Sequence, residues 1–508
     1  MQNKKVLAVD LGASSGRLFC VSLDNGKLNL DEIHRFNNAG IHVGDRFYTD
    51  ILYILQEILI GLKKVYQKEE HIESIGIDSW GVDFAILDED EELLSNPYHY
   101  RDVQSAGMQI EAKKLFGKRG LFMETGVQDM WYNTVYQMLG IKNRKPHFFD
   151  RSICFLMIPD ILGFCLTGNK TIEYTIASTT QMYDVKNKKW SDLVMEGLGI
   201  APKVFPKVIM TGESKGYVNS KIKKLAGIPE EENLRLIATA EHDSSSAAYA
   251  VPSGDDIGIF INSGTWSIIG SVIDEPIVTE EIYNKGYSNE GAAFGKIKLV
   301  KSIMGMWLIQ ELKKSWNRRG MREDYDFLIN EAQEAMPFAH MINVDDEIFT
   351  APLDMADAMN QYCTYTKQIP METQGEFYRG VMESLAFKYR EAVEDLEAII
   401  GKTVGTIYLL GGAVQDKMFC RFIANATGKC VSAGPVEASV TGNALVQFRA
   451  LGGLEEETEF KSIIQNSFDI CYYEPEDEML WNQMYNKYLE ITGTAFRDST
   501  LIADGGTR

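Results

Sequence analysis

The segment IATAEHDSSSAAYA (237–250) carries the residues best suited to acid–base chemistry. An apolar run delivers His242 and Asp243 into a string of small residues, the pattern of a strand that ends where a helix begins. Asp243 can serve as a carboxylate base that accepts a proton from a substrate hydroxyl at about 2.6–3.2 Å. It can also be the N-cap of a helix through SSSAAYA, because Asp is a favoured N-cap residue. This segment alone leaves both interpretations open.

A second candidate is the small-residue turn in KVLAVDLGASSGRLFCVSL (5–23). A Walker A loop and a dinucleotide fingerprint are excluded, because the glycines lead into Arg17 and another apolar run, without a helix-opening Gly-Lys or a third glycine. The pattern predicts a hairpin of strands 5–10 and 17–23. Backbone N–H groups and two hydroxyls in such a turn suit an anion such as phosphate, and an ordinary surface hairpin is the alternative.

Two further stretches have residues that suit ligands. GIDSWGVDFAIL places Trp80 beside Gly81 with Asp78 and Asp83 close in sequence, which suits a sugar platform with carboxylates to receive hydroxyls. A core tryptophan with two turn aspartates is the alternative for this stretch. Gly411–Gly412 follows an apolar strand, where the backbone can lie against a base or ribose, or simply form a turn that needs positive φ.

The framework that must position these residues alternates strands with helices. Apolar residues recur with a helical period over 51–65, and Thr49 or Asp50 precedes them as a cap. The same period covers 375–401 and stops at a glycine, and the strand 406–410 follows it. Alternation of this kind predicts an α/β fold.

The chain repeats one structural plan about a domain apart. IGIFINSGTWSIIGSVI (257–273) has the same strand, small-residue turn and strand as residues 5–23. AVPSGDD (250–256) has the Pro, Gly and Asp expected of a boundary. Because 508 residues exceed what one hydrophobic core supports, we predict two α/β lobes, 1–250 and 251–508.

Composition narrows the class of protein. A net charge of −21 argues against nucleic acid as a partner, because counterion displacement needs a basic surface, but it leaves nucleotides open. The N-terminal residues lack an apolar signal region, and no apolar run reaches 18 residues, so we expect a cytoplasmic protein without a membrane partner. Seven cysteines without a C-x-x-C pair predict buried reduced thiols.

Taken together, the motifs resemble the FGGY family of carbohydrate kinases, and in particular its branch that phosphorylates L-rhamnulose. The matching segments span most of residues 5–450 in the order VDLGASSGR, HRFNN, IGIDSWGVDF, YRD, EHDSSSA, SGTWS, IMGMWLIQ, GGAVQD and GPVEAS. The resemblance implies an α/β, two-lobed, actin-like fold of the sugar kinase/Hsp70/actin, ribonuclease H-like kind. It also implies a cleft between the lobes that closes on ATP, Mg²⁺ and a ketose.

The resemblance further implies roles for individual residues. Asp243 is the catalytic base, and Asp10 helps to organise the metal ion. The nucleotide contacts are Ala13, Ser14, Ser15, Gly16, Arg17, Thr265, Gln310 and Gly412. The substrate contacts are Gly81, His242, Asp243, Ser244 and Ser302.

Three positions depart from the family pattern. Ser302 stands where the resemblance leads us to expect Asn before IMG, Ser244 stands for Thr, and GGAVQD replaces a GGGCQN-like run. Because serine has a shorter reach than asparagine, the first change leaves the identity of the sugar open. The other two changes are conservative and leave the expected chemistry in place.

We therefore expect ATP-dependent phosphorylation of L-rhamnulose at the C1 hydroxyl, giving L-rhamnulose 1-phosphate and ADP. A kinase for another ketose, such as L-fuculose or L-xylulose, is the nearest alternative. A non-catalytic sugar- or ATP-binding protein of the same fold is a second alternative, against which the intact Asp243 and both turns count. The expected partners are the ketose and ATP, in a monomer or small homo-oligomer.

Overall fold

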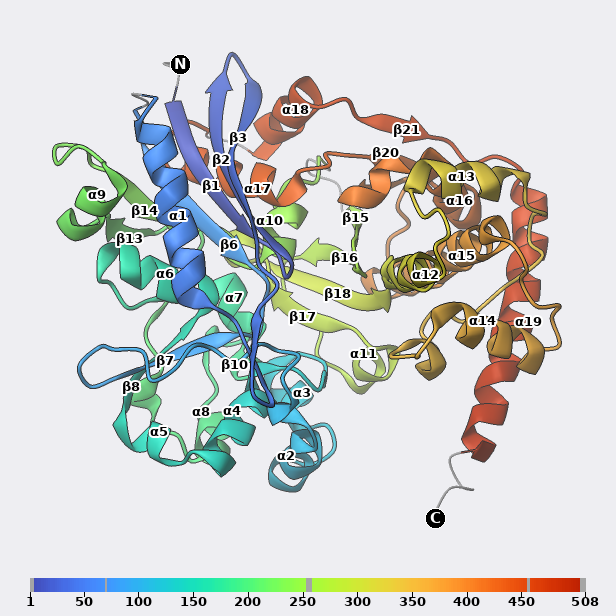
Figure 1. Ribbon diagram of the computed structural model, residues 1–508, viewed down its shortest axis with the longest axis horizontal. Helices are drawn as coiled ribbons and strands as arrows, with labels where there is room; N and C mark the ends of the chain where they lie inside the picture. Colours follow the sequence, from blue (N-terminus) through green and yellow to red (C-terminus); the bar gives the residue numbers. More distant parts are fainter. Residues whose placement is uncertain (1–3, 69–70, 253–257, 455–456, 503–508) are drawn as a thin grey trace. The chain divides into compact units, whose positions relative to one another are not determined.

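The computed structural model describes residues 4–68, 71–252, 258–454 and 457–502 (Figure 1). The chain divides into two compact units. The first comprises residues 1–257, 272–300 and 437–468, and the second comprises 258–271, 301–436 and 469–508. Two segments beyond residue 250 therefore pack with the N-terminal part of the chain. The expected boundary at 250–256 lies partly outside the described residues, as does the tail 503–508.

A mixed six-stranded sheet in the order β13-β14-β6-β1-β2-β3 forms the centre of the first unit. β1 pairs antiparallel with β2 and parallel with β6. The predicted hairpin is thus confirmed, and the sheet continues into β3, a strand that the sequence analysis did not assign. The strands are β1 (Lys4–Leu11), β2 (Ser15–Asp24), β3 (Lys27–Asn37), β6 (Ser74–Ser79), β13 (Ser214–Tyr217) and β14 (Arg235–Ile237).

Shorter strands and thirteen helices surround this sheet within the described residues of the first unit. The shorter strands are β4 (Ile41–Val43), β5 (Arg46–Tyr48), β7 (Phe84–Asp88), β8 (Ser152–Met157), β9 (Ile172–Glu173), β10 (Tyr183–Asp184), β11 (Lys189–Trp190), β12 (Val208–Ile209) and β17 (Ser288–Gly291). The helices are α1 (Ile51–Tyr66), α2 (Met108–Phe116), α3 (Gly120–Thr125), α4 (Thr134–Arg144), α5 (His147–Arg151), α6 (Ile158–Thr167), α7 (Tyr174–Ser178), α8 (Asp192–Leu198), α9 (Ser220–Ala226), α10 (Asp243–Tyr249), α11 (Glu280–Lys285), α17 (Ala438–Ala450) and α18 (Glu457–Ser467).

Alternation along the strands gives the sheet of the first unit two different faces. On one face, Ile75 and Ile77 of β6 join a hydrophobic core with Ile54 and Leu62 of α1, the blue helix that runs along the strands in Figure 1. α1 begins as predicted, with the Asp50 carboxylate accepting from a backbone N–H in the first turn. The opposite face carries the polar residues of β6 and is covered by α17.

The second unit repeats the strand plan of the first. Its strands belong to a seven-stranded sheet in the order β17-β18-β16-β15-β19-β20-β21, and β15 pairs antiparallel with β16 and parallel with β19, as β1 does with β2 and β6. The strands are β15 (Ile259–Ser263), β16 (Trp266–Ile273), β18 (Ile297–Met304), β19 (Thr406–Leu410), β20 (Cys430–Ala433) and β21 (Cys471–Tyr473). Residues 272–273 of β16 and 297–300 of β18 belong to the first unit. The hairpin expected at 257–273 is therefore present, over Ile259–Ser263 and Trp266–Ile273.

The helices of the second unit include the long one that the sequence predicts. α15 begins with a capping box between Thr373 and Glu376 and ends at Gly401, whose φ of 73° favours glycine. Gly411 after β19 also has a positive φ, 80°, so the turn interpretation of this glycine holds. The helices are α12 (Trp307–Arg318), α13 (Tyr325–Glu334), α14 (Met355–Tyr365), α15 (Gln374–Ile400), α16 (Lys417–Thr427) and α19 (Glu478–Ile502).

The thiols largely follow the expectation from composition. All seven cysteines are free, and the buried ones are Cys20, Cys154, Cys363 and Cys420, whereas Cys471 is exposed. Within the described part of the chain, no helix is both long and apolar enough to cross a membrane.

α10 and α17 approach each other so closely that one contact requires glycine. A Cβ atom on Gly442 would lie 1.8 Å from the backbone oxygen of Ser246. Gly442→Ala must therefore push the two helices apart, and we expect the first unit to lose roughly 3 kcal/mol of stability, measured by urea unfolding. Gly405→Ala is the control, because that Cβ meets open space. Equal unfolding midpoints for the two variants would contradict the packing described here.

Candidate active site

Three charged side chains form a row across one face of the first sheet. Asp10 of β1 lies opposite Arg17 of β2 and beside Asp78 of β6 in the strand registers. The Arg17 guanidinium donates to the Asp10 carboxylate through Nη2 and through Nε at 3.2 Å. Its Nη1 donates to Glu437 at 2.6 Å, just before α17. Arg17 therefore bridges two carboxylates, and one of them, Glu437, is 420 residues away in the sequence.

Asp78 is fully buried beside Asp10. Its Oδ2 accepts from Asn443 of α17 at 2.6 Å. Burial, reinforced by the negative charge of Asp10, raises the pKa of Asp78 well above its ordinary range. Asp78 thus lies in the sheet beside the first hairpin, whereas its sequence context suggested a contact with a sugar hydroxyl.

The start of α10 carries His242 and Asp243, as the sequence indicates. His242 is the N-cap and Asp243 is the first helical residue, so the N-cap interpretation of Asp243 is wrong by one position. Two hydrogen bonds from backbone N–H groups fix this segment. The Ser79 N–H donates to the Glu241 carbonyl at 2.9 Å, and the His242 N–H donates to Thr175 Oγ1 at 3.1 Å.

The Asp243 carboxyl remains accessible, with 32% of its side chain exposed. Burial of the surrounding site raises its pKa, His242 and Lys298 oppose that shift, and Asp10 reinforces it. The Asp243 segment lies at the end of β6, because His242 forms a β-bridge with Ser79, the residue after Asp78. A partly accessible carboxylate is suited to accepting a proton from a bound hydroxyl.

A buried ion pair next to these residues was missed by the sequence analysis. Lys298 of β18 is fully buried and lies 3.0 Å from Glu290 of β17. Its Nζ also donates to Ser244 Oγ at 2.6 Å. The Glu290 carboxylate lies 3.3 Å from His242 Nδ1, and Lys298 and His242 hold its pKa at about 2 despite burial. In sequence, Lys298 stands among other lysines of a strand and carries no signal that separates it from a solvated residue.

Gly81 lies in a constrained turn next to the His242 segment. Ser79, two residues earlier, forms a β-bridge with His242. A Cβ on Gly81 would lie 3.0 Å from Thr179 Oγ1, and the same hydroxyl accepts from the N–H of Val82 at 3.2 Å. Val82 has a φ of 70°, which is strained for a β-branched residue and typical of sites that the fold over-determines.

The aromatic platform considered for this turn is not open. Trp80 is 7% exposed, and its indole N–H donates to Asp83 at 3.0 Å. Asp83 is itself buried and also accepts from Thr49 at 3.3 Å. The core interpretation therefore describes Trp80 and Asp83, while Gly81 stays a candidate contact.

The tip of the first hairpin is exposed at Ala13 and Ser14. Asn38 holds the turn, since its N–H donates to the Ser14 carbonyl at 3.0 Å and its Nδ2 donates to the Gly12 carbonyl at 2.8 Å. Gly16 is buried, and a Cβ there would lie 2.1 Å from the Phe36 ring. Packing against β3 therefore explains this glycine without reference to a ligand.

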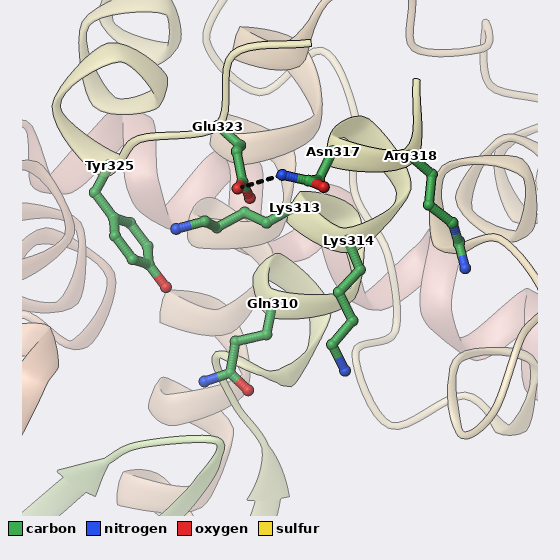
Figure 2. A pocket seen from close by; sticks show the side chains of 7 residues that line it. All are labelled: Gln310, Lys313, Lys314, Asn317, Arg318, Glu323 and Tyr325. Atoms are coloured by element: carbon green, nitrogen blue, oxygen red, sulfur yellow. Dashed lines mark hydrogen bonds between the residues drawn. The ribbon is translucent and has the colours of Figure 1, made fainter. Parts of the chain in front are cut away.

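In the second unit, the structure brings together two of the expected nucleotide contacts. Thr265 Oγ1 and the Gln310 side-chain amide lie 3.2 Å apart. Gln310 lies at one end of a pocket of about 520 Å³ on α12 (Figure 2), in the size range of small-molecule sites. In Figure 2, Lys313 reaches toward Tyr325. The pocket is lined by Gln310, Lys313, Lys314, Asn317, Arg318, Glu323 and Tyr325.

The remaining two expected contacts are exposed. Gly412 follows the strained Gly411 turn, and a Cβ there would meet nothing within 4 Å. Ser302 lies in β18, four residues after Lys298 and hence on the same face of that strand. Both positions are accessible to a ligand of their own unit.

Comparison with known proteins decides the family. The FGGY family of carbohydrate kinases matches through its N-terminal domain at residues 5–250 and its C-terminal domain at 259–451. The chain belongs to the FGGY family of carbohydrate kinases. The predicted class, an ATP-dependent sugar kinase with an α/β two-domain fold, is therefore confirmed.

FGGY relatives extend along nearly the whole chain. It is 36% identical over 478 residues to a rhamnulokinase of Bacteroides thetaiotaomicron, covering 94% of this chain and 97% of the relative. It is 38% identical over 468 residues to a rhamnulokinase of Halalkalibacterium halodurans, covering 92% and 98%.

Solved structures support the same FGGY fold. The gluconate kinase and the ligand-bound xylulose kinase of Lactobacillus acidophilus each superpose with a TM-score of 0.80. Each superposition includes 96% of this chain. The superpositions include 98% of the gluconate kinase and 97% of the xylulose kinase. At 18% identity, these matches establish the fold alone.

Behind the His242 segment lies a buried polar network. The Glu173 carboxylate accepts from the N–H groups of Thr175 and Glu241 at 2.7 and 3.2 Å, and from the Thr211 hydroxyl at 2.6 Å. Next to it, Lys215 lies between Asp160 and Glu241 at 2.5 and 2.6 Å. Burial raises the pKa of Glu173 to about 7 despite these hydrogen bonds.

Glu173 should make the stability of the protein depend on pH. Because its folded pKa exceeds the ordinary 4.5, its stabilising contribution is complete below about pH 4.5 and is lost as pH rises through 7. Glu173→Gln keeps an acceptor oxygen and removes the titration. We expect the loss of stability between pH 5 and 8, followed by urea unfolding, to shrink by roughly 1–3 kcal/mol in this variant.

The exposed Glu111 provides the control for this measurement, since Glu111→Gln should keep the full pH dependence. Asp83 and Glu383, whose pKa values burial also raises to about 7, should leave part of the dependence in both variants. An unchanged pH dependence in Glu173→Gln would contradict this assignment.

Proposed function

We propose that the protein transfers the γ-phosphoryl group of ATP to the C1 hydroxyl of L-rhamnulose, giving L-rhamnulose 1-phosphate and ADP. The observation that carries the proposal is the β-bridge of His242 with Ser79, which sets the Asp243 segment at the end of β6, in the same unit as the row of Arg17, Asp10 and Asp78. The choice of sugar rests on the rhamnulokinases to which the chain is 36–38% identical.

Asp243 acts as the general base in this proposal. It accepts the proton of the C1 hydroxyl as that oxygen attacks the γ-phosphorus in line, and its raised pKa makes the carboxylate a stronger base. Arg17 stabilises negative charge on the transferring group, together with the exposed turn at Ala13 and Ser14. Phosphoryl transfer needs little further chemistry from the protein, because it depends mainly on positioning and charge stabilisation.

The residues at Asp10 fit a magnesium ion that accompanies ATP. Magnesium prefers one or two carboxylates together with phosphate oxygens and water. Asp10 and Asp78 offer carboxyl oxygens side by side, and Asp78 Oδ1 is buried without a hydrogen-bond partner. Bound there, the ion would neutralise phosphate charge, and Asp10 would hold it.

The other assignments follow the same proposal. The nucleotide contacts in the second unit are Thr265, Gln310 and Gly412. In the first unit they are Ala13, Ser14, Ser15, Gly16 and Arg17, and the ketose contacts there are Gly81, His242, Asp243 and Ser244. Ser302 is a further ketose contact.

Asp243→Asn should remove the base while leaving its shape and hydrogen-bonding reach nearly intact. We expect kcat with L-rhamnulose to fall about 10²–10⁴-fold, with the KM values for ATP and ketose changed little, in an assay coupled to ADP release. Asp31→Asn is the control, since that residue is exposed and pairs with Lys68 at the surface. Near-normal turnover by Asp243→Asn would exclude Asp243 as the base.

A panel of ketoses tests the sugar. We expect kcat/KM for L-rhamnulose to exceed the values for L-fuculose and L-xylulose by at least about tenfold, because a site that hydrogen-bonds one hydroxyl pattern rejects another. Ser302→Asn lengthens the side chain at the position that departs from the family pattern. A different preferred ketose in the wild-type protein would overturn the choice of sugar while leaving the kinase assignment intact.

A further inference from the structure

We propose that Lys298 and Glu290 are positioning residues that fix Ser244 as a hydrogen-bond donor to the oxygen next to the reacting hydroxyl of the ketose. The inference deepens the proposed function and rests on it, because Ser244 and Asp243 are there assigned to the sugar. Neither Lys298 nor Glu290 has a role in that assignment.

The pair is built into the strands. Glu290 of β17 and Lys298 of β18 lie directly opposite each other in the antiparallel register. Their charged atoms are 3.0 Å apart, and the lysine is fully buried. A buried ammonium must keep its hydrogen bonds, because an unpaired one is strongly destabilising. The geometry therefore holds Lys298 Nζ in one place.

That fixed ammonium determines the polarity of Ser244. An ammonium can only donate, so at 2.6 Å Ser244 Oγ must accept from it. The hydroxyl proton of Ser244 is then left to be donated elsewhere. Ser244 Oγ lies 3.2 Å from His242 Nε2 and 3.3 Å from Nδ1, and an unprotonated ring nitrogen can take this proton until a substrate oxygen replaces it.

Glu290 also contacts His242. An ionised carboxylate only accepts, and it lies 3.3 Å from His242 Nδ1. His242 Nδ1 also lies 3.3 Å from Ser244 Oγ and 3.4 Å from Lys298 Nζ, and Nε2 lies 3.6 Å from Asp243 Oδ1, so the ion pair also contacts the ring that faces Ser244.

The result is an acceptor followed by a donor at consecutive residues. Asp243 accepts from the reacting hydroxyl, and Ser244 donates to the oxygen on the adjacent carbon. An α-hydroxyketone, or its hemiacetal form, has this arrangement of a donating hydroxyl beside an accepting oxygen. The inference therefore specifies two neighbouring oxygens of the substrate, a hydroxyl that donates to Asp243 and an oxygen that accepts from Ser244.

Kinetics of Lys298 variants test the inference. We expect Lys298→Met to raise the KM for L-rhamnulose about tenfold while the KM for ATP stays within about twofold, and Lys298→Arg to restore most of the loss. Lys298→Met should also add little to Ser244→Ala, because the lysine acts through that hydroxyl. KM does not depend on the fraction of protein that is folded, so a purely structural role would leave it unchanged.

Because Lys298→Met leaves Glu290 buried without its partner, a second variant removes both charges. Lys298→Met/Glu290→Met should fold, since apolar residues can replace a buried pair, and should show the same rise in ketose KM. The control is Arg379→Met/Glu383→Gln, which removes another ion pair, 2.7 Å long, in α15. This control should keep the wild-type KM for ketose.

Two outcomes would overturn the inference, and they are distinguishable. If the wild-type protein phosphorylates a ketose but the Lys298 variants keep its KM, or if their effect adds fully to that of Ser244→Ala, the positioning role is wrong. If no ketose stimulates ADP release by the wild-type protein, the proposed function fails and this inference fails with it.

Discussion

The first unit holds several carboxyl groups close together in a largely buried site, and its structure depends on compensating their charge. Asp10 lies beside Asp78 in the sheet, the Asp243 segment follows at the end of β6, and burial raises the pKa of Asp78 and Asp243. Like charges in such a place are costly unless cations or protons compensate them. Arg17 provides a cation beside Asp10, and Lys298 provides a cation beside Ser244, next in sequence to Asp243. In the proposed function, this centre receives ATP together with its metal ion.

This constraint explains why the chain returns to the first unit after residue 436. Glu437 completes the contacts of Arg17, and Asn443 satisfies one oxygen of Asp78. α17 can deliver both only if it lies close against α10, which Gly442 permits. The late segment of the sequence is thus part of the site and not an independent addition to it.

The repeated strand plan shows what distinguishes the two units. Counted from the hairpin turns, Ile268, Asn262 and Leu410 occupy the positions of Arg17, Asp10 and Asp78. The second hairpin is instead tied together by hydroxyls, with Tyr389 OH 3.2 Å from Ser263 Oγ and 2.5 Å from Ser267 Oγ. One copy of the plan therefore carries the charged chemistry, and the other offers a neutral turn, whose Thr265 meets Gln310.

The sequence predicts those features that are local in the chain. The hairpin with Asp10 and Arg17, the start of α10 at Asp243 and the long helix α15 all follow from periodicity, caps and turns within about 30 residues. Contacts made across the fold escaped prediction. Lys298 gives no sign in sequence that it lies fully buried against Ser244, and the pairing of Arg17 with Glu437 joins residues 420 positions apart. The position of Asp78 beside Asp10 also escaped prediction, because it depends on the parallel pairing of β1 with β6, which local sequence does not reveal.

Identification of the product tests the central claim most directly. Purified protein incubated with ATP, Mg²⁺ and L-rhamnulose should yield ADP and a ketose monophosphate in equal amounts, with phosphorus coupled to the C1 methylene protons in the NMR spectrum. Release of inorganic phosphate in place of a sugar phosphate, or a phosphate on a different carbon, would contradict the account.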